Sequence, residues 1–398
     1  MPNNRASLSR STIPLRVVQL NSLLTGGGTD DQSVKLATGL QRMGHEVWMA
    51  GPEGREFSKV IREQNLRYHT TPFEGPGKLR LIFSVAQILR RERIQIVHGH
   101  HGRDLWATIF AARLSGVRPR IVLTRHLAKS PSSWFSRRFL LGQCDALIAV
   151  SHFVGKVLRD GVYEPDSPEP ERRSRPPLRG DHSKIRVIYG GIDTTRFCPF
   201  DASAQRQEWG IAPEAFVFAV VGGYDRPRGK GQREFLRAAS KVAKQMPHAR
   251  FLIIGRGNLR EILESDIAEL GLAGKAYLTP YCRDMPAAMN AIDCLVHPQI
   301  GTEAFPGVVL EAFACGKPVI ASALDGIPEA FAAGKHGRLV PPEDIDSLAS
   351  ALREQANLAP ASNDERDDVH RRVGERFSIQ AMVEGVADLY QKLLQAAD

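Results

Sequence analysis

Two glutamates, Glu303 and Glu311, flank a Phe-Pro-Gly turn in the segment GTEAFPGVVLEAFACGKPVIAS, residues 301–322. A helix that starts at this turn would point its first backbone amides at an anion. Carboxylates accept hydrogen bonds from neighbouring hydroxyls. A ligand with phosphates between a ribose and a hexose, a nucleotide sugar, would satisfy this set. For the two glutamates alone, an ordinary capped helix with Glu311 on its exposed face is the alternative.

A second group of chemically useful residues lies in VVGGYDRPRGKGQREFLRAA, residues 220–239. Arg226, Arg228 and Lys230 lie in a glycine-rich turn that leads into a helix, as a diphosphate site would require. The segment is not a Walker loop, because the pattern G-x-x-x-x-G-K-[ST] is absent. A solvated basic loop is the alternative.

A third candidate is TGGGTDDQS, residues 25–33, between the first predicted strand and the first predicted helix. Gly27 and Gly28 would let backbone approach a phosphate or a sugar closely. The spacing is not G-x-G-x-x-G, and the second predicted strand ends without the acidic residue that would hold a ribose. We therefore exclude a dinucleotide fingerprint, and a plain turn remains the alternative.

Histidines end two neighbouring predicted strands: His126 ends LTRH, and His98, His100 and His101 lie one strand earlier. Either set could be hydrogen-bonded scaffold. No carboxylate or cysteine completes a local metal site. The only D-x-D, Asp344 and Asp346, opens a predicted helix, where we expect a cap. We expect no metal.

Short apolar runs alternate with helical stretches throughout the chain, which is typical of parallel sheets built from βαβ units. Ligands bind such sheets at the carboxyl ends of the strands, where each motif above falls. The expected strands are residues 15–20, 45–50, 94–100, 120–126, 145–150 and 185–189, then 216–221, 250–255, 276–280, 294–298 and 318–322.

A chain of 398 residues exceeds one ordinary core, so we predict two Rossmann-like domains of the α/β class. The predicted parts are a disordered tail at 1–13, a first domain at 14–197 with a flexible loop at 163–184, a second domain at 198–375, and a C-terminal helix at 376–398 that packs back on the first domain.

The composition is that of a soluble globular protein, with 42% hydrophobic and 24% charged residues. No apolar run is long enough to span a membrane, and the polar first fourteen residues do not read as a signal peptide. Five scattered cysteines suit a reducing cytoplasm. Lys and Arg outnumber Asp and Glu by 31 to 17 in residues 1–197, whereas the remainder has 22 against 27. The basic half would face an acidic substrate, an anionic membrane or nucleic acid.

Taken together, these segments resemble the family 4 glycosyltransferases, retaining enzymes with the GT-B fold of two Rossmann-like domains that face a central cleft. GTEAFPGVVLEAFACGKPVIAS followed by DGIPEAF is similar to their E-x7-E segment. GGGTDDQSVKLATGLQRMGHEV, IVHGHHG, LTRH, DALIAVS, IRVIYGGIDTTRF and GKGQREFLRAA look like their N-terminal loop, successive strand ends and phosphate loop. The similarity spans nearly the whole chain.

The resemblance implies roles for individual residues. Glu311 would hold the donor's ribose, Glu303 and His126 would lie by the transferred sugar, and Lys230 with Arg226 or Arg228 would neutralise the diphosphate. The family's usual arginine position is occupied here by Asp225. The implied catalytic residues are Glu303, His126 and Lys230, and the implied donor-binding residues are Gly27, Gly28, Arg226, Arg228, Lys230, Phe305, Pro306, Gly307, Val308 and Glu311.

The resemblance also implies the reaction, which moves a sugar from a nucleotide diphosphate to an acceptor hydroxyl with retention. No residue is an evident nucleophile, so same-face attack is the simpler hypothesis, without metal or cofactor. Alternatives are a GT-B-fold epimerase or phosphorylase and a non-catalytic nucleotide-sugar-binding protein. Nucleic-acid binding is disfavoured, because the basic stretches form no known recognition module.

The basic first half favours an anionic acceptor, such as a phosphorylated lipid or a lipopolysaccharide core, in cell-surface glycan synthesis. We expect a cytoplasmic protein that also reaches the inner face of the cytoplasmic membrane. Residues 130–143 combine three aromatic residues with Arg137 and Arg138, which suits a membrane-surface helix. A core-packing helix is the alternative.

Overall fold

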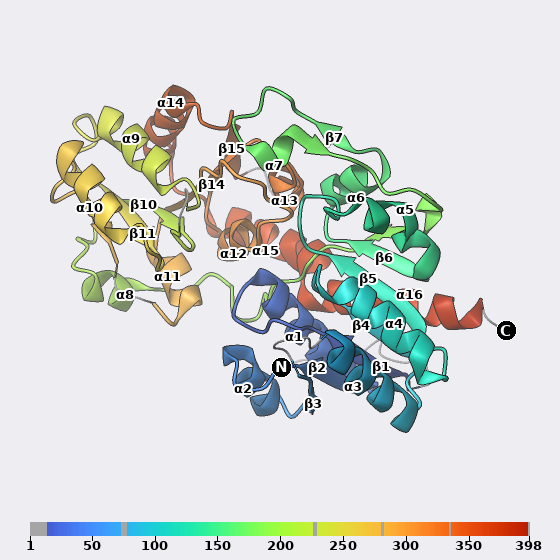
Figure 1. Ribbon diagram of the computed structural model, residues 1–398. Coiled ribbons are helices and arrows are strands. Elements are labelled where there is room, and N and C mark those ends of the chain that lie inside the picture. Colours follow the sequence, from blue (N-terminus) through green and yellow to red (C-terminus); the bar gives the residue numbers. More distant parts are fainter. Residues whose placement is uncertain (1–13, 73–77, 226–228, 280–281, 334–335, 397–398) are drawn as a thin grey trace. The chain divides into compact units, whose positions relative to one another are not determined.

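The computed structural model describes residues 14–72, 78–225, 229–279, 282–333 and 336–396 (Figure 1). The chain divides into two compact units. The first contains Met1–Thr124, Gln143–Ala146 and Ala387–Asp398, and the second contains Arg125–Gly142 and Leu147–Val386. The tail predicted to be disordered, residues 1–13, lies outside the described residues. The domain boundaries expected from the sequence stay a prediction.

Seven strands form a sheet in the order β3-β2-β1-β4-β5-β6-β9. The pairs β1–β2, β1–β4, β2–β3, β4–β5 and β6–β9 are parallel. All six strands predicted in this half are present, and β3 is an additional edge strand. The strands are β1 (Arg16–Leu20), β2 (Glu46–Gly51), β3 (Arg67–Thr70), β4 (Ile96–Gly99), β5 (Arg120–Arg125), β6 (Ala146–Ala149) and β9 (Ile185–Val187).

Helices alternate with these strands, as the βαβ pattern predicts. Gly44, at φ +91°, donates its amide to the Gln41 carbonyl just beyond the first helix, as expected of a C-terminal glycine. The helices are α1 (Gly28–Arg42), α2 (Glu56–Glu63), α3 (Lys78–Arg91), α4 (Asp104–Ser115), α5 (Trp134–Gln143) and α6 (His152–Arg159).

The second unit contains a six-stranded parallel sheet in the order β12-β11-β10-β13-β14-β15. Its strands are β10 (Phe216–Val221), β11 (Ala249–Ile254), β12 (Ala276–Leu278), β13 (Cys294–His297), β14 (Val319–Ser322) and β15 (Gly337–Val340). Its helices are α8 (Ser203–Glu208), α9 (Gln232–Val242), α10 (Arg260–Glu269), α11 (Met285–Ala291), α12 (Gly307–Ala314), α13 (Ile327–Ala330), α14 (Ile345–Ala356) and α15 (Asn363–Phe377), with a 3-10 turn at Phe331–Ala333.

Side chains alternate between the two faces of this sheet because the strand period is two residues. In β10, Val217 and Ala219 enter one core, together with residues of α12 and α15. Phe218 and Val220 enter the other core, together with residues of α9, α10 and α14. Burial on both faces explains the continuous apolar runs in the sequence. The prediction of two doubly wound parallel sheets is confirmed.

The segment 163–184, predicted from its composition to bury little, carries short regular elements. These are β7 (Val162–Tyr163), α7 (Pro170–Arg173), β8 (Ser174–Arg175) and a 3-10 turn at His182–Lys184. Contrary to this prediction, Ser167, Leu178 and Arg175 are buried, and of these only Arg175 carries a charge, on a fully buried side chain. It forms ion pairs of 2.9 Å with both Glu164 and Asp325. A buried guanidinium with two carboxylate partners fixes this part of the segment, which composition alone does not reveal.

The C-terminal helix, α16 (Ile379–Gln395), ends in the first unit. There the Tyr390 hydroxyl lies 3.1 Å from Gln19 Nε2 and 2.6 Å from His98 Nδ1. Ser378, directly before this helix, forms a parallel bridge with Ile192. All five cysteines are free. None of the helices in the described part of the chain combines the length and the apolar character needed to cross a bilayer.

Candidate functional site

The candidate site lies where β10 and β13 of the six-stranded sheet end. The next strands in the chain lie on opposite sides of this pair, since β11 follows β10 outward on one side and β14 follows β13 on the other. Such a switch in strand order leaves a crevice at the carboxyl ends of the strands. The helices that follow, α9 and α12, begin at Gln232 and Gly307, so their N-termini face the same edge.

Two of the predicted catalytic residues meet at this edge. Lys230 Nζ lies 2.9 Å from Glu303 Oε2. The Lys230 side chain is 38% exposed and the Glu303 side chain 15% exposed. Burial acts to raise the pKa of Glu303, but the charges of Lys230 and His297 and the Phe305 amide outweigh it and hold the pKa below its ordinary value. Glu303 is therefore ionised at neutral pH, and Lys230 retains one exposed side.

The loop that carries Lys230 is shaped by its neighbours. Gly231 has φ +84°, and a side chain there would collide with the Pro298 carbonyl. The buried Gln232 accepts a hydrogen bond of 2.6 Å from the Lys230 amide. Asp225, at the position where the family has an arginine, accepts a hydrogen bond from the Asn258 amide at 3.1 Å. Asp225 thus connects two loops. Arg226 and Arg228 lie outside the described residues.

His297, the last residue of β13, belongs to this site and was not predicted. Its side chain is 2% exposed, and Nε2 lies 3.9 Å from Glu303 Oε2. Neither ring nitrogen has a hydrogen-bond partner among the described residues. Burial lowers the pKa of His297 to about 4, with Glu303 and Lys230 acting in opposite directions. A neutral imidazole with unused hydrogen-bonding capacity therefore lies beside the Lys230–Glu303 pair.

A buried ion pair contacts the backbone of Glu303. Asp325 Oδ2 accepts a hydrogen bond of 3.1 Å from the Glu303 amide. Its other oxygen accepts one of 2.9 Å from Arg175 Nη1. Arg175 and Asp325 are 0% and 1% exposed in their side chains. Because both side chains of this ion pair are buried, we infer that Arg175 and Asp325 position Glu303. Only Asp325 had a sequence signal, in the DGIPEAF segment.

Helix α12 begins at the Phe-Pro-Gly turn. Pro306 is the N-cap residue and Gly307 the first helical residue. Phe305 packs on Tyr189 and Phe377, with ring centroids 4.9 and 5.5 Å apart. This packing fixes the turn. The partly buried Val308 and Glu311 follow on α12 at the same edge.

The remaining predicted residues lie at other strand ends. In the first unit, α1 begins at Gly28, and a side chain at Gly27 or Gly28 would meet nothing within 4 Å. The half-buried His126 directly follows β5 and belongs to the second unit. Their roles as donor-binding or catalytic residues stay predictions.

The other histidines and the D-x-D have structural partners. His98 contacts Tyr390 through Nδ1 and Thr124 Oγ1 through Nε2, each at 2.6 Å. His100 Nε2 lies 2.6 Å from Gln19 Oε1. Asp344 caps α14 by accepting the Ser347 amide, as expected. No group of three or more His, Cys, Asp or Glu residues suited to a metal occurs within the described ranges.

Known proteins share both the sequence pattern and the fold. The family model described as Glycosyltransferase Family 4 matches residues 26–166, and that described as Glycosyl transferases group 1 matches residues 215–357. A D-inositol 3-phosphate glycosyltransferase of Mycobacterium marinum is 28% identical over 310 residues, which cover 71% of this chain and 62% of the relative.

Two further similarities cover different shares of the chain. A phosphatidyl-myo-inositol mannosyltransferase of Mycolicibacterium smegmatis is 37% identical over 168 residues, 42% of this chain and 41% of the relative. The crystal structure of a glycosyltransferase from Rickettsia africae superimposes with a TM-score of 0.81 at 18% identity, covering 96% of this chain and 99% of the other.

Proposed function

Because this chain belongs to glycosyltransferase family 4, we propose that it transfers a sugar from a nucleotide diphosphate to an acceptor hydroxyl with retention at the anomeric carbon. The observation that carries the proposal is the Lys230–Glu303 pair, 2.9 Å apart, between the N-termini of α9 and α12. A cation and two helix N-termini suit a diphosphate, and a carboxylate beside them suits sugar hydroxyls. Glu311 would hold the ribose.

Lys230 has a specific part in this proposal. Without donor, Glu303 neutralises its ammonium group. The diphosphate offers more negative charge and would share Lys230 with Glu303. As the bond between the anomeric carbon and the diphosphate oxygen breaks, negative charge grows on the departing phosphate. A cation held in place beforehand stabilises that transition state more than the bound substrate.

The proposed transfer occurs on one face of the sugar. The acceptor oxygen bonds to the anomeric carbon on the side from which the diphosphate leaves, and the acceptor's proton passes to an oxygen of the departing diphosphate. Glu303, neutral His297 and His126 would orient the sugar hydroxyls. The reaction as proposed needs neither a metal nor a cofactor. Trapping a covalent glycosyl-enzyme in Glu303→Gln would contradict same-face attack.

A panel of nucleotide sugars, screened by thermal shift, tests the donor. We expect at least one of them to raise the unfolding midpoint, and we expect slow hydrolysis of that compound. Lys230→Ala and Glu311→Ala should each lose both effects. The absence of any stabilising nucleotide sugar, or full turnover in both variants, would contradict the proposal. The anomeric configuration of the product, read by NMR, tests retention.

For the acceptor, we propose a phosphate-bearing molecule, lipid-linked or part of a lipopolysaccharide core. The excess of Lys and Arg in residues 1–197 supports it. The names of two relatives also support it, since D-inositol 3-phosphate and phosphatidyl-myo-inositol both carry phosphate. Transfer to phosphorylated but not to dephosphorylated forms of an acceptor would test this step.

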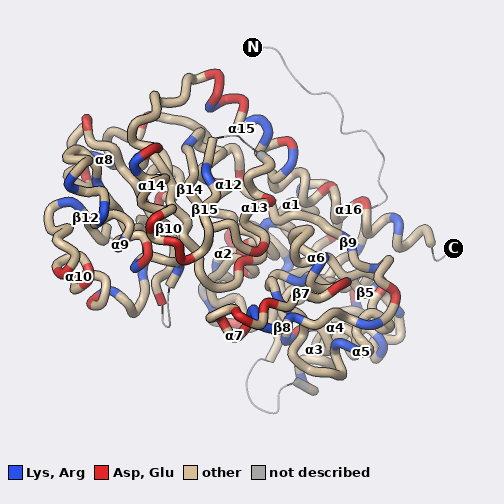
Figure 2. Tube along the Cα trace, turned by 90° about the horizontal axis from the view of Figure 1, so that it is seen from above, with Lys and Arg blue, Asp and Glu red and all other residues tan. Residues whose placement is uncertain are grey.

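Helix α5 supports contact with an anionic membrane. Trp134, Phe135 and Phe139 are 62%, 51% and 36% exposed, although Leu140 and Leu141 on the same helix are buried. Arg138 lies over the Phe139 ring, 5.1 Å from its centroid, and basic residues are visible along this helix (Figure 2). Exposed aromatic and basic side chains together suit a lipid interface.

Flotation with anionic liposomes tests the membrane contact. Changing Arg137 and Arg138 to glutamate should abolish flotation at physiological salt, because the change reverses two charges and so lowers the net charge by four. The charge reversal of Arg371 and Arg372 on α15 is the matched control and should leave flotation intact. Equal flotation of both variants would contradict the proposed role of α5.

A further inference from the structure

The second unit contains two adjoining cavities at the amino edge of its six-stranded sheet. Their volumes are about 680 and 850 Å³. They share Arg206, Pro213, Asp293, Lys317 and Arg366 as lining residues. Asp293 and Pro318 directly precede β13 and β14. The cavities therefore open at the strand ends opposite those that carry Lys230 and Glu303.

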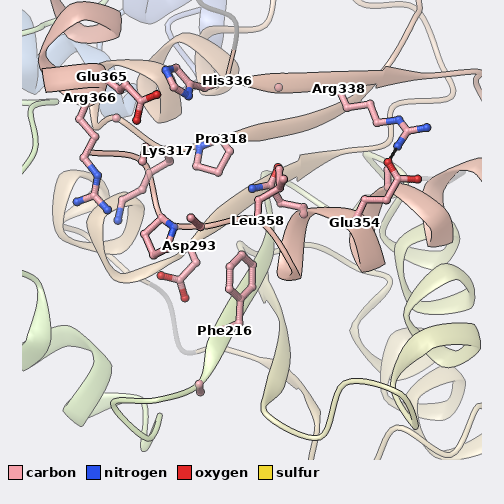
Figure 3. A pocket seen from close by; sticks show the side chains of 18 of the residues that line it. Phe216, Asp293, Lys317, Pro318, His336, Arg338, Glu354, Leu358, Glu365 and Arg366 are labelled. Atoms are coloured by element: carbon pink, nitrogen blue, oxygen red, sulfur yellow. Dashed lines mark hydrogen bonds and ion pairs between the residues drawn. The ribbon is translucent and has the colours of Figure 1, made fainter. Parts of the chain in front are cut away.

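Two cations face this space from different elements. Lys317 follows the end of α12, and Arg366 lies in the first turn of α15 (Figure 3). Lys317 Nζ donates a hydrogen bond of 2.9 Å to the Asn290 carbonyl. Burial lowers the pKa of Lys317 to about 8, Asp293 opposes this shift, and Arg366 and Arg206 add to it. Two positive groups thus lie close enough to repel each other in a half-buried place.

Asp293, the acidic residue that lines both cavities, already accepts hydrogen bonds within the protein. Asp293 Oδ2 accepts hydrogen bonds of 2.6 Å from Arg206 Nη2 and 2.8 Å from the Val217 amide. Arg206 also donates to the Ala291 carbonyl. The remaining lining acids have other partners or are exposed: Glu354 pairs with Arg338, Glu365 accepts a hydrogen bond from the Ser362 amide, Asp201 accepts hydrogen bonds from Ser203, and Glu214 is exposed. Asp293 neutralises Arg206, so Lys317 and Arg366 are the cations left for a ligand.

Arg366 is oriented toward the cavity without full use of its donors. Its Nε is buried and has no hydrogen-bond partner in the part of the chain that the structure describes. Gly316, at φ +68°, allows α15 to approach, since a side chain there would come within 2.7 Å of Arg366 Cβ. The Arg366 guanidinium is therefore not saturated by hydrogen bonds within the protein.

From this arrangement we propose that the amino-edge cavity is a second binding site, which takes a small phosphate ester or phosphate itself between Lys317 and Arg366. Phosphate oxygens would accept from the Lys317 ammonium group and from the Arg366 guanidinium together. The rim is less polar, with Pro213, Pro360 and Leu358, which is 61% exposed. The volume suits a ligand of sugar-phosphate size.

This site is separate from the donor site but rigidly connected to it. The Lys317 amide donates to the Ala312 carbonyl and the Gly316 amide to the Phe313 carbonyl, each at 2.9 Å. Lys317 is therefore fixed to the end of α12, the helix whose first turn belongs to the donor site. The two sites lie at opposite edges of one sheet, so the anion and the nucleotide sugar would bind at the same time.

Calorimetry on the full chain at pH 7 and constant ionic strength tests the proposal, with inorganic phosphate and a hexose monophosphate as separate probes. We expect saturable binding that weakens at least tenfold in Lys317→Gln and in Arg366→Gln. Lys317→Arg, which keeps the charge, should retain binding. Tighter binding of the ester than of free phosphate would identify an organic phosphate as the ligand, and equal binding would identify phosphate.

Two controls separate this site from the donor site. Arg371→Gln changes an exposed arginine farther along α15, and Lys230→Gln changes the donor-site cation; both should leave phosphate binding intact. Phosphate should also protect Lys317 from an amine-directed reagent, as read by mass spectrometry. Phosphate binding that is unchanged in both Lys317→Gln and Arg366→Gln, or that is lost in Lys230→Gln, would overturn the proposed second site. Either result would leave the proposed transfer reaction unaffected.

Discussion

The two edges of the six-stranded sheet hold a lysine in different ways. At the carboxyl edge, Lys230 has its own carboxylate, Glu303, at 2.9 Å. At the amino edge, Lys317 donates to a neutral carbonyl, while Asp293, which lines the same cavities, is paired with Arg206. A compensated cation is ready to exchange partners, whereas an uncompensated one stores electrostatic cost that a ligand can relieve. We interpret the first as a reacting site and the second as a binding site.

The largest expected effect concerns the support of the carboxyl edge. Arg175→Met leaves Asp325 buried without its charge partner. Breaking a buried ion pair on one side costs about 3–5 kcal/mol, so we expect the free energy of unfolding to fall by this amount in denaturant titrations. Arg179→Met, at an exposed position of the same segment, is the control. A loss under about 1 kcal/mol would mean that Arg175 does not hold Asp325.

The next prediction sets the two lysines against each other in a turnover assay. Lys230→Gln should lower kcat by about 10²–10³-fold, the cost of removing one preorganised charge from a developing anion. Lys317→Gln should leave kcat within about twofold, since it lies at the opposite edge. Equal losses in both variants would remove the functional distinction between the edges.

The sequence predicts the interior of this fold better than its margins. Strands such as β10 and β13, buried on both faces, read as apolar runs and were all predicted. The edge strands β3 and β15 were missed because exposed and half-buried residues dominate them. Polar and exposed residues interrupt the continuous apolar run by which strands buried on both faces are recognised.

The candidate site shows a similar division. Lys230 and Glu303 lie in motifs with glycine and proline signals, so the sequence located both at strand ends, where the structure joins them. His297 ends an apolar run, and nothing in its neighbours marks it as different from a core residue. Arg175 lies in a Pro- and Arg-rich segment, where an arginine is normally solvated. Its burial depends on Asp325, 150 residues away along the chain.

The third prediction concerns pH at the carboxyl edge. His297 has a folded pKa of about 4 against an ordinary value of 6.5. Between these pH values the unfolded chain binds a proton that the folded chain does not. The contribution of His297 to the free energy of unfolding is therefore fully present above pH 6.5 and falls by about 3 kcal/mol in total as the pH drops toward 4. His297→Gln should remove that part of the pH dependence. Identical pH profiles for both proteins would contradict the buried neutral state of His297.

The smallest expected effect sharpens the comparison from the amino edge. Lys317 has a lowered pKa of about 8, against an ordinary value of 10.5. At pH 7 the lysine is charged in the folded protein, and the full penalty for this buried charge lowers the free energy of unfolding. Lys317→Gln should therefore raise the unfolding free energy at pH 7 by about 2 kcal/mol, after about 1 kcal/mol is lost from a weaker hydrogen bond to Asn290. The gain should shrink as pH rises from 8 to 10.5, because the wild-type lysine then becomes neutral.

Added phosphate should also reduce the gain in unfolding free energy, since it stabilises only the wild type. A variant less stable than the wild type at pH 7, with no pH dependence of the difference, would show that Lys317 is an ordinary structural residue.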